Sequence, residues 1–488
     1  MLHCLNSAES KEIRSFLSES GYNTEALITA FGRTEIPHIH LLKLYLVGIT
    51  LQPDRLNVLF RWFWIGSAVE APIARHFIPQ RVIDLFLKSG MLVAEDEHFR
   101  SPFRISPFNE FFILSDHAVR GPGPSRSDTV LWPNPTSMLC YHLSMQAPVG
   151  RTLDLGTGNG ILALTAAGHS TSVVATDLNP RAQAFCLFNA CLNGVSNIEF
   201  REGSAFEPVH DEQFDLILAN PPFFVTPTVR RIYSDNSMKL DGFCRTLVRQ
   251  APAHLNENGY CQMLVEWVQL KGQSWRDRVE EWFGGLGCDA WVLVDYMRLS
   301  MDYALIRLQE DRDEMADPAA QAALINSWRQ YFEDHNVEAI CGGIIVLRRR
   351  QGRNWIRMEE LKSMPSRPFG EFMRRIFEIR DYLESHSEEE LLDTRPFLPA
   401  SAQLHKQFAA SSDGWKLTAV ELQPGEGLPY SLALQPQVAD FVSLCDGKRT
   451  LREIADQTAA AVSVEAAIVR RESCNIIRRV ADRGMILL

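Results

Sequence analysis

Between residues 148 and 350, short apolar runs alternate with segments of helical character. Continuous apolar runs bounded by turn residues predict strands that are buried on both faces. Their alternation with helices predicts a parallel sheet covered by helices on both sides. The expected strands are Thr152–Leu155, Ser172–Thr176, Asn197–Phe200, Phe214–Ala219, Gly259–Val265, Ala290–Val294 and Gly342–Leu347. We expect a helix over 161–167 and a helical insertion centred on 319–332, which gives a seven-stranded α/β domain over residues 130–350.

The first 120 residues show helical spacing of apolar side chains and predict a separate N-terminal domain. Ile13, Phe16 and Leu17 share one helical face, and Gly21 follows where a helix would end. Further apolar groups lie at Leu41, Leu42, Leu44, Tyr45, Leu46 and Val47 (helix or strand), at Leu56, Leu59, Phe60, Trp62, Phe63 and Trp64, and at Val82, Ile83, Leu85, Phe86 and Leu87. The last group leads to Gly90 and an apolar run, and this helix, glycine, strand order predicts a winged-helix-like unit. Such a unit docks nucleic acid or protein, or serves only as a lid or packing domain.

Residues 351–488 predict a C-terminal domain that ends in the same order of elements. A charged helix is expected around 372–383, and Thr450 with Glu453 has the spacing of a capping box. A second helix ends at Gly484, and residues 485–488 read as a strand. We therefore expect a second winged-helix-like unit, which binds a partner or only packs.

Two rigid, turn-rich segments separate the N-terminal region from the predicted sheet. Gly121–Ser127 contains two prolines and two glycines, and Trp132–Ser137 precedes an apolar helix expected to begin at Met138. The second segment comes just before the first core strand. It is interpreted either as a flap over a ligand or as an ordinary connection between domains.

Composition is that of a water-soluble globular protein and excludes several classes. The 488 residues suffice for about three domains. The net charge of −11 argues against a broad basic surface and leaves a local basic groove as an open alternative. The ten cysteines form no C-x-x-C pair, which predicts buried thiols in a reducing compartment, without disulfides or zinc. No signal peptide is seen, and no apolar run reaches the ~18 residues of a membrane span. We expect a cytoplasmic enzyme without a bound metal.

A glycine-rich turn, Asp154-Leu155-Gly156-Thr157-Gly158-Asn159-Gly160, follows the first predicted core strand. Glycines allow a tight turn there and let a ligand approach the backbone closely. The third glycine comes two residues after the second, whereas the dinucleotide fingerprint needs three. Pyrophosphate binding in the dinucleotide manner is therefore disfavoured, and with it a nicotinamide dehydrogenase.

Polar residues follow the second and third predicted strands as well. Asp177 ends the second strand, and its carboxylate can accept hydrogen bonds from both hydroxyls of a ribose. A helix cap is the alternative role for this residue. After the third strand, Ser204 or a backbone N–H is a candidate contact for an adenine edge, and Phe206 a candidate for packing on the ring. An ordinary loop with a buried phenylalanine is the alternative there.

The fourth predicted strand ends in Asn220-Pro221-Pro222-Phe223. Two prolines cannot continue the strand ladder, so the chain turns there. The turn presents an amide side chain, a proline carbonyl and an aromatic ring at the carboxyl edge of the sheet, where α/β folds bind ligands. This combination suits a flat group that is held by its NH2.

In this order the three motifs resemble the class I S-adenosylmethionine-dependent methyltransferases, which have a Rossmann-like seven-stranded core. The resemblance is to the small-methyltransferase group with an NPPF or NPPY motif, which includes release-factor glutamine N5-methyltransferases and rRNA and tRNA N-methyltransferases. It implies that Asp154, Gly156, Gly158 and Gly160 surround the methionine part of the cofactor and that Asp177 holds its ribose. It also implies that Asn220, Pro221 and Phe223 face the substrate. Related enzymes often carry Asp at the position of Ser204, the expected adenine contact.

The resemblance implies N-methylation of a planar NH2 in a macromolecule. The lone pair of such a nitrogen is delocalised; if the Asn220 side-chain oxygen and the Pro221 carbonyl accept its two hydrogens, the lone pair is freed and aimed at the methyl donor. Phe223, with Phe224, would stack on the flat group, and no general base is needed before transfer. The acceptor remains open between a protein glutamine amide and an exocyclic amine of RNA or DNA. Phe224 stands where the RNA guanine group often has His, and the acidic charge favours protein. The alternative of another class is a non-catalytic cofactor-binding or macromolecule-docking module.

Overall fold

The computed structural model describes residues 2–26, 54–117, 126–308, 317–363, 368–425 and 429–488. Residues 1–141 and 148–358 form one compact unit, and residues 142–147 and 359–488 form the other. The apolar group from Leu41 to Val47 and the linker residues Gly121–Ser125 lie outside the described residues. Within the described ranges, no helix is long and apolar enough to cross a membrane.

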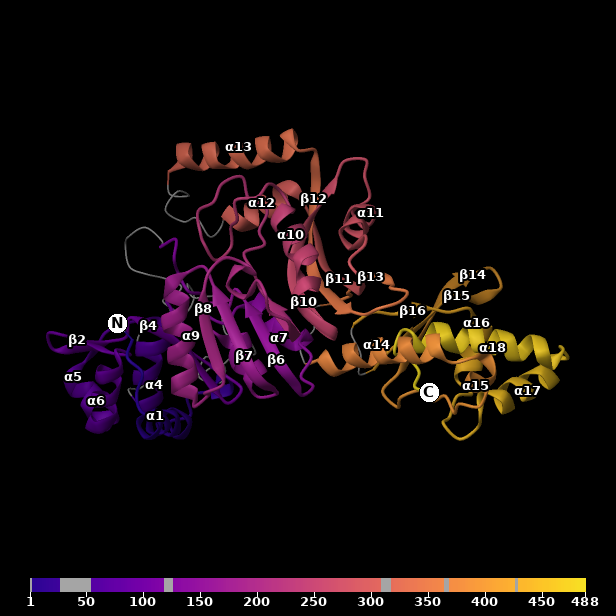
Figure 1. The fold of residues 1–488 in the computed structure, drawn as a ribbon, viewed down its shortest axis with the longest axis horizontal. Coiled ribbons are helices and arrows are strands. Elements are labelled where there is room, and N and C mark those ends of the chain that lie inside the picture. The colour runs from indigo at the N-terminus through magenta and orange to yellow at the C-terminus, as the bar shows by residue number, and fades with distance from the viewer. Residues whose placement is uncertain (1, 27–53, 118–125, 309–316, 364–367, 426–428) are drawn as a thin grey trace. The chain divides into compact units, whose positions relative to one another are not determined.

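The first unit is built on a mixed eight-stranded sheet (Figure 1). In spatial order its strands are β13 (Ile356–Glu360), β11 (Cys288–Leu299), β12 (Val337–Arg349), β10 (Leu255–Leu270), β9 (Phe214–Ala219), β6 (Val149–Leu155), β7 (Ser170–Asp177) and β8 (Ile198–Glu202). The parallel pairs are β10 with β9, β9 with β6, β6 with β7, and β7 with β8. The strand order reverses between β6 and β9, which is where an open α/β sheet binds its ligand.

The other edge of the sheet departs from the all-parallel prediction. Strand β12 runs antiparallel to both β10 and β11 and lies between them. An eighth strand, β13, follows the seven that the sequence predicts and pairs at the edge beside β11. The apolar run of β12 is the same in either direction, so its sequence carries no signal for its orientation.

Helices connect the parallel strands as crossovers, as expected for an α/β sheet. Between strands along the chain lie α7 (Pro135–Leu143), α8 (Ile161–Ala167), α9 (Pro180–Asn193), η2 (Glu207–Val209), α10 (Gly242–Gln250), η3 (Ala251–His254), α11 (Trp275–Glu280), η4 (Glu281–Phe283), α12 (Ser300–Leu308) and α13 (Pro318–Asp334). The predicted helical insertion before the last long strand is confirmed as α13. Its buried Leu324, Trp328 and Phe332 pack in one cluster with Tyr303 and Val225.

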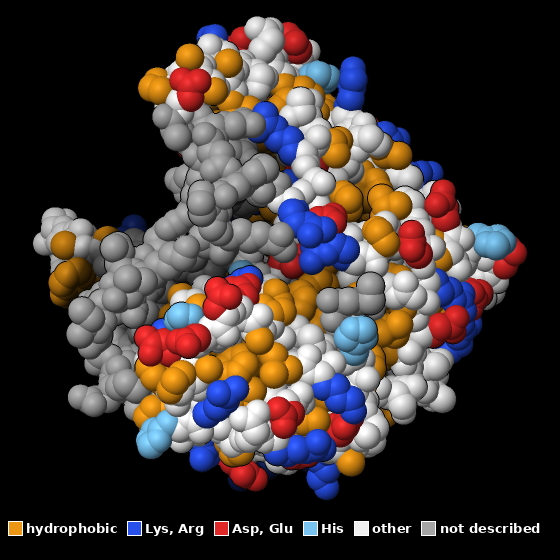
Figure 2. All heavy atoms as spheres, turned by 90° about the vertical axis from the view of Figure 1, so that its left-hand side faces the viewer, with side chains coloured by type: hydrophobic (Ala, Val, Ile, Leu, Met, Phe, Trp, Pro, Cys, Tyr) orange, Lys and Arg blue, Asp and Glu red, His pale blue; other side chains and the backbone are white. Residues whose placement is uncertain are grey.

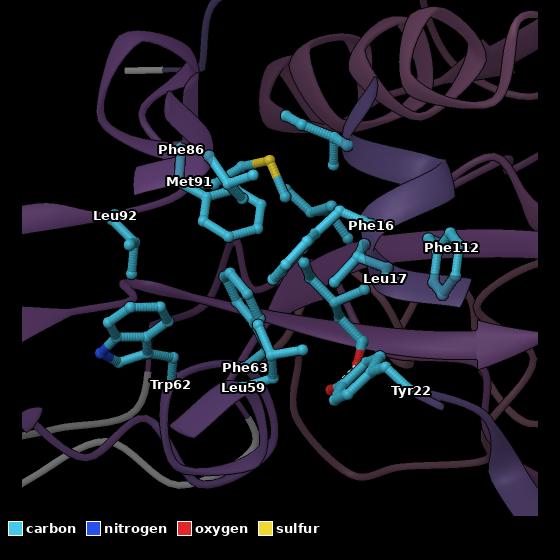
Figure 3. Packing of buried hydrophobic residues seen from close by; sticks show 14 of the residues in the cluster. Phe16, Leu17, Tyr22, Leu59, Trp62, Phe63, Phe86, Met91, Leu92 and Phe112 are labelled. Carbon is cyan, nitrogen blue, oxygen red and sulfur yellow. Dashed lines mark hydrogen bonds between the residues drawn. The ribbon is translucent and has the colours of Figure 1, made fainter. Parts of the chain in front are cut away.

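The N-terminal residues pack around an aromatic core in the same unit (Figure 3). Their elements are α1 (Ser7–Glu19), α4 (Arg55–Phe60), η1 (Arg61–Ile65), β1 (Val69–Glu70), α5 (Ala71–Phe77), α6 (Gln80–Ser89), β2 (Val93–Glu95), β3 (His98–Arg100), β4 (Phe103–Phe108) and β5 (Phe111–Asp116). The Phe63 and Phe86 rings meet edge to face, with centroids 5.1 Å apart. Gly90 ends α6 with φ +78° before β2, in the predicted order of elements. The winged-helix-like assignment and the three-domain division stay predictions.

A buried asparagine on α9, Asn189, joins the N-terminal region to the sheet. The Asn189 side chain accepts from the Leu114 N–H at 2.8 Å and donates to the Leu114 carbonyl at 2.9 Å, as a neighbouring strand would. Its amide also donates to the Asn159 carbonyl in the glycine-rich turn at 2.8 Å. The N-terminal region therefore contacts the element that borders the predicted cofactor site.

The second unit contains α14 (Gly370–Ser385), α15 (Glu388–Leu392), β14 (Gln403–Ser411), β15 (Gly414–Gln423), β16 (Leu432–Ala433), α16 (Pro436–Val442), α17 (Leu451–Val462) and α18 (Ala466–Ala481). The predicted capping box is confirmed: the Thr450 side chain accepts from the Glu453 N–H, and the Glu453 carboxylate accepts from the Thr450 N–H. The predicted strand at residues 485–488 is wrong. Leu487 makes only an isolated bridge to Phe397.

Charged side chains of both signs are intermixed over the described part of the face drawn in Figure 2. All ten cysteines are free thiols and eight of them are buried, whereas Cys4 is exposed and Cys191 half-buried.

Candidate active site

The glycine-rich turn and the Asn-Pro-Pro-Phe turn meet at the carboxyl edge of the sheet. Strands β6 and β9 are neighbours, with Leu155 opposite Ala219, so the two turns begin side by side. Gly156 has φ +75°, and a Cβ added to it would lie 3.5 Å from the Cα of Pro221. The sequence motifs predicted to form one site are thus in direct contact.

Gly158 and Gly160 differ in what surrounds them. Gly158 has φ +55°, and a Cβ there would have no atom of the described residues within 4 Å, so this side of the turn is open among them. A Cβ on Gly160 would lie 3.0 Å from the sulfur of Cys186 on α9 and 3.2 Å from its Cα. Gly160 is therefore required for close packing of α8 on α9, whether or not it also borders a ligand.

One oxygen of the Asp154 carboxylate accepts hydrogen bonds that stabilise the glycine-rich turn, and the other accepts none from the described residues. Its Oδ2 accepts from the Thr157 hydroxyl at 2.5 Å and from the Ala163 N–H at 2.9 Å. Its Oδ1 is buried and accepts no hydrogen bond from the described residues. Burial raises the pKa of the Asp154 carboxyl to about 7. A buried acceptor without a donor is costly, so a ligand that brings a donor or a positive charge fits this position.

Asp177 ends β7 with both carboxylate oxygens directed to backbone donors. Oδ2 accepts from the Gly158 N–H and Oδ1 from the Asn179 N–H, each at 2.8 Å. Burial raises the pKa of Asp177, and these hydrogen bonds oppose the rise. Each oxygen retains a second lone pair, so the carboxylate can still accept from two hydroxyls of a ribose. The residues present therefore fit an adenosine-type ligand with a cationic tail.

The loop after β8 supports only part of what was expected of it. The Gly203 N–H donates to the Asp177 carbonyl at 3.0 Å. Ser204, which is half-buried, is the next residue and is therefore held near Asp177. Phe206, in contrast, is only 4% exposed and its ring lies parallel to the His254 ring, with centroids 4.4 Å apart. The expectation that Phe206 packs on a bound ring is wrong, because the side chain belongs to the core.

The Asn220 side chain is hydrogen-bonded to residues of α7. Its amide nitrogen donates to the Ser137 hydroxyl at 3.2 Å and lies 3.5 Å from the Thr136 hydroxyl. Among the described residues, none donates to its Oδ1 or to the Pro221 carbonyl. Two acceptor oxygens at this turn are therefore unused by the protein, as gripping an NH2 would require.

The Thr136 and Ser137 contacts were missed because the helix was expected to begin at Met138. Helix α7 begins at Pro135, so both hydroxyls lie in its first turn. The Asn134 side chain accepts from the Ser137 N–H at 2.9 Å, as a capping residue does. Asn-Pro at a helix start was the available signal.

The two phenylalanines of the turn are largely covered. Phe223 is 7% exposed and meets Phe224 edge to face at 5.0 Å. The Arg307 guanidinium lies 3.5 Å above the centre of the Phe224 ring. Only a small part of Phe223 and one face of Phe224 remain for stacking on a substrate, and that role stays a prediction.

A buried carboxylate that the sequence did not reveal anchors the chain after the turn. Glu266 on β10 accepts from the Val225 N–H at 3.2 Å and from the Tyr303 hydroxyl at 2.7 Å, and also from the Tyr296 hydroxyl. Burial raises the pKa of Glu266. Both tyrosines come from the region of β11 and α12, so only the fold brings them together.

The segment before α7 borders the glycine-rich turn. The Asn159 amide donates to the Leu131 carbonyl at 2.7 Å. The Val130 N–H donates to Asp116 at 2.8 Å, and Arg181 on α9 donates to both oxygens of the same carboxylate. Residues 130 and 131, just before the predicted flap Trp132–Ser137, are thus fixed to the glycine-rich turn and, through Asp116, to α9. The choice between a flap and an ordinary connection stays a prediction.

Known proteins resemble this part of the chain. Residues 134–286 match the family model described as methyltransferase small domain, which confirms the resemblance of the motifs. Residues 374–488 match a family described as a domain of unknown function (DUF7782).

Two curated relatives are named release factor glutamine methyltransferase. That of Xylella fastidiosa (strain Temecula1) is 33% identical over 132 residues, which are 24% of this chain and 48% of the relative. That of Cereibacter sphaeroides is 34% identical over 163 residues, 30% of this chain and 57% of the relative. The chain spans about half the length of the curated relatives it matches. Among solved structures, a ribosomal protein L11 methylase from Lactobacillus delbrueckii subsp. bulgaricus is 25% identical with a TM-score of 0.23, covering 33% of this chain and 69% of its own.

Proposed function

We propose that this chain methylates a planar NH2 group with S-adenosylmethionine as the methyl donor and that the acceptor is a glutamine amide of a protein. One observation carries the proposal: the glycine-rich turn lies against the Asn-Pro-Pro-Phe turn, so that a Cβ added to Gly156 would lie 3.5 Å from the Pro221 Cα. A cofactor held by the first turn is therefore next to a group held by the second. The names of the curated relatives support glutamine as the acceptor.

The cofactor would supply a methyl group on a positively charged sulfur, which is open to attack by a nitrogen lone pair. Asp154, Gly156 and Gly158 would border its methionine part, Asp177 would accept from its ribose hydroxyls, and Ser204 would reach its adenine. These residues bind and orient, and Gly160 contributes by letting α8 and α9 approach. Ionised Asp154 would stabilise the positive charges of the ligand.

The protein's part in the transfer is to orient the acceptor nitrogen. The Asn220 Oδ1 and the Pro221 carbonyl would accept its two hydrogens and so disfavour delocalisation of the lone pair. Oriented dipoles of this kind cost no reorganisation during the reaction. The proton is lost only after the new N–C bond forms, because the methylated nitrogen is then acidic.

Cofactor binding is expected to depend on the ionisation of Asp154. Its pKa of about 7 in the free protein means that the carboxyl is neutral at pH 6 and charged at pH 8. A cationic ligand favours the charged form, so binding releases a proton and tightens as the pH rises through 7. Relative to Asp154→Asn, which cannot ionise, the affinity of the native protein should rise about tenfold from pH 6 to pH 8.

Calorimetry at both pH values measures this ratio and cancels the ionisation of the ligand itself. Titration in buffers of different ionisation enthalpy gives the number of protons released. A ratio that stays constant between pH 6 and pH 8 would show that Asp154 does not titrate against the cofactor.

The acceptor is tested with tritiated S-adenosylmethionine and extract from a strain that lacks the gene. We expect label that survives nuclease and is removed by protease. Acid hydrolysis of an N-methylated amide releases methylammonium, so the label should become volatile as methylamine once the hydrolysate is made alkaline. Nuclease-sensitive label would instead assign an amine of a nucleobase. No transfer to any fraction, with the cofactor bound, would assign a non-catalytic binding module.

A further inference from the structure

We propose that Asn134, acting through the hydroxyls of Thr136 and Ser137, sets the orientation of the Asn220 amide so that its oxygen faces the acceptor. These three residues are positioning residues, since each acts through Asn220. The inference rests on the proposed function for its catalytic consequence. The orientation of the amide follows from the protein's own hydrogen bonds.

A backbone N–H shows which atom of the Asn134 side chain is the oxygen. That assignment then gives the donor in each hydrogen bond of the group. The Ser137 N–H, which can only donate, lies 2.9 Å from one atom of the Asn134 side chain, so that atom is the amide oxygen. The same oxygen lies 2.7 Å from the Thr136 hydroxyl and 3.2 Å from the Ser137 hydroxyl. An amide oxygen carries no hydrogen, so the hydroxyl is the donor in each of these two hydrogen bonds.

Each hydroxyl has a single hydrogen, and both hydrogens are directed to Asn134. What Thr136 and Ser137 offer to Asn220 is therefore only lone pairs, at 3.5 Å and 3.2 Å. The group of Asn220 that faces them must be the NH2. Its oxygen consequently points the other way, to the position where a substrate N–H can be accepted.

This arrangement removes an ambiguity that an isolated asparagine has. The two ends of a side-chain amide have nearly the same shape, so sterics alone do not distinguish the orientations. In the flipped orientation the Asn220 oxygen would face two hydroxyl lone pairs, and the NH2 would be presented to the substrate NH2, donor to donor. Ser137 is 8% exposed, so water does not readily replace its contact.

The test removes both hydroxyls and leaves the helix cap intact. In the double variant Thr136→Val, Ser137→Ala, Asn134 still accepts the N–H of residue 137, so the helix is retained. We expect the single-turnover rate of methyl transfer to fall about tenfold from misorientation, with the Kd for S-adenosylmethionine and the melting temperature unchanged. Thr136→Ser with Ser137→Thr keeps both hydroxyls and should restore the rate.

A second readout does not depend on activity. In protein labelled with ¹⁵N-asparagine, the side-chain NH2 signals of Asn220, identified by their loss in Asn220→Ala, should exchange slowly with water. In the double variant the exchange should accelerate. Unchanged exchange or an unchanged rate overturns the inference. A native protein that transfers no methyl group but shows the expected exchange would contradict the proposed function and leave the orientation established.

Discussion

Replacing Asn220 by alanine is expected to lower the rate of methyl transfer about 100- to 1,000-fold, the range measured when one oriented group that stabilises a transition state is removed. Without this side chain, only the Pro221 carbonyl remains to accept from the acceptor nitrogen. The lone pair then stays delocalised for most of the time that the substrate is bound. The affinity for S-adenosylmethionine should not change, because the Asn220 side chain contacts Thr136 and Ser137 rather than the glycine-rich turn.

Single-turnover measurement with saturating cofactor isolates the transfer step, and calorimetry checks cofactor binding. Asn256→Ala is a matched control at the opposite end of β9, where the Asn256 amide donates to Asp215 at 2.8 Å. It removes the same number of atoms and should keep the native rate. If Asn220→Ala retains more than about a tenth of that rate, Asn220 is not the acceptor of the substrate hydrogen.

Replacing Asp177 by alanine is expected to abolish measurable cofactor binding. Two hydrogen bonds from ribose hydroxyls to a carboxylate are lost, and each such bond contributes roughly 1.5–3 kcal/mol. Together they correspond to a loss of affinity of more than about 100-fold. The substitution also leaves the Gly158 and Asn179 N–H groups without their acceptor, which loosens the turn itself.

Asp177→Asn separates these two effects. The asparagine keeps one oxygen to accept a backbone N–H, so it should bind the cofactor more weakly than the native protein and more tightly than the alanine variant. Asp211→Ala is the control, because Asp211 is exposed and lies outside the site. Calorimetry at constant pH gives the affinities of the native protein and the three variants, and equal binding by native protein and Asp177→Ala would remove Asp177 from the cofactor site.

Much of the site was predictable because parallel strands place their carboxyl ends at one edge. Once the apolar runs are assigned to strands β6, β7 and β9, the glycine-rich turn, Asp177 and Asn220 must lie near one another. The sequence itself sets how many residues separate each of these groups from the end of its strand. Because the strands are neighbours, Gly156 lies close to Pro221.

Other parts of the fold were not predictable from local pattern. The apolar run of β12 predicts a buried strand, but its antiparallel direction depends on α12 and α13, which leave the chain at the end of the sheet where β11 stops, so that Ala339 pairs with Leu299. The apolar run at residues 485–488 predicts a strand equally well. Among the described residues no partner strand lies beside it, and Leu487 alone pairs there, with Phe397.

The sequence by itself determined which groups meet at the carboxyl edge of the sheet, because the glycine-rich turn, Asp177 and Asn220 each stand at the end of a parallel strand. Tertiary structure alone decided where their side chains point. Phe206 turns into the core because His254 lies beside it, and Glu266 reaches Val225 across neighbouring strands. The Asn220 amide has its orientation because α7 brings two hydroxyls to one of its ends. Side-chain direction depends on neighbours distant in sequence, and no local pattern encodes those neighbours.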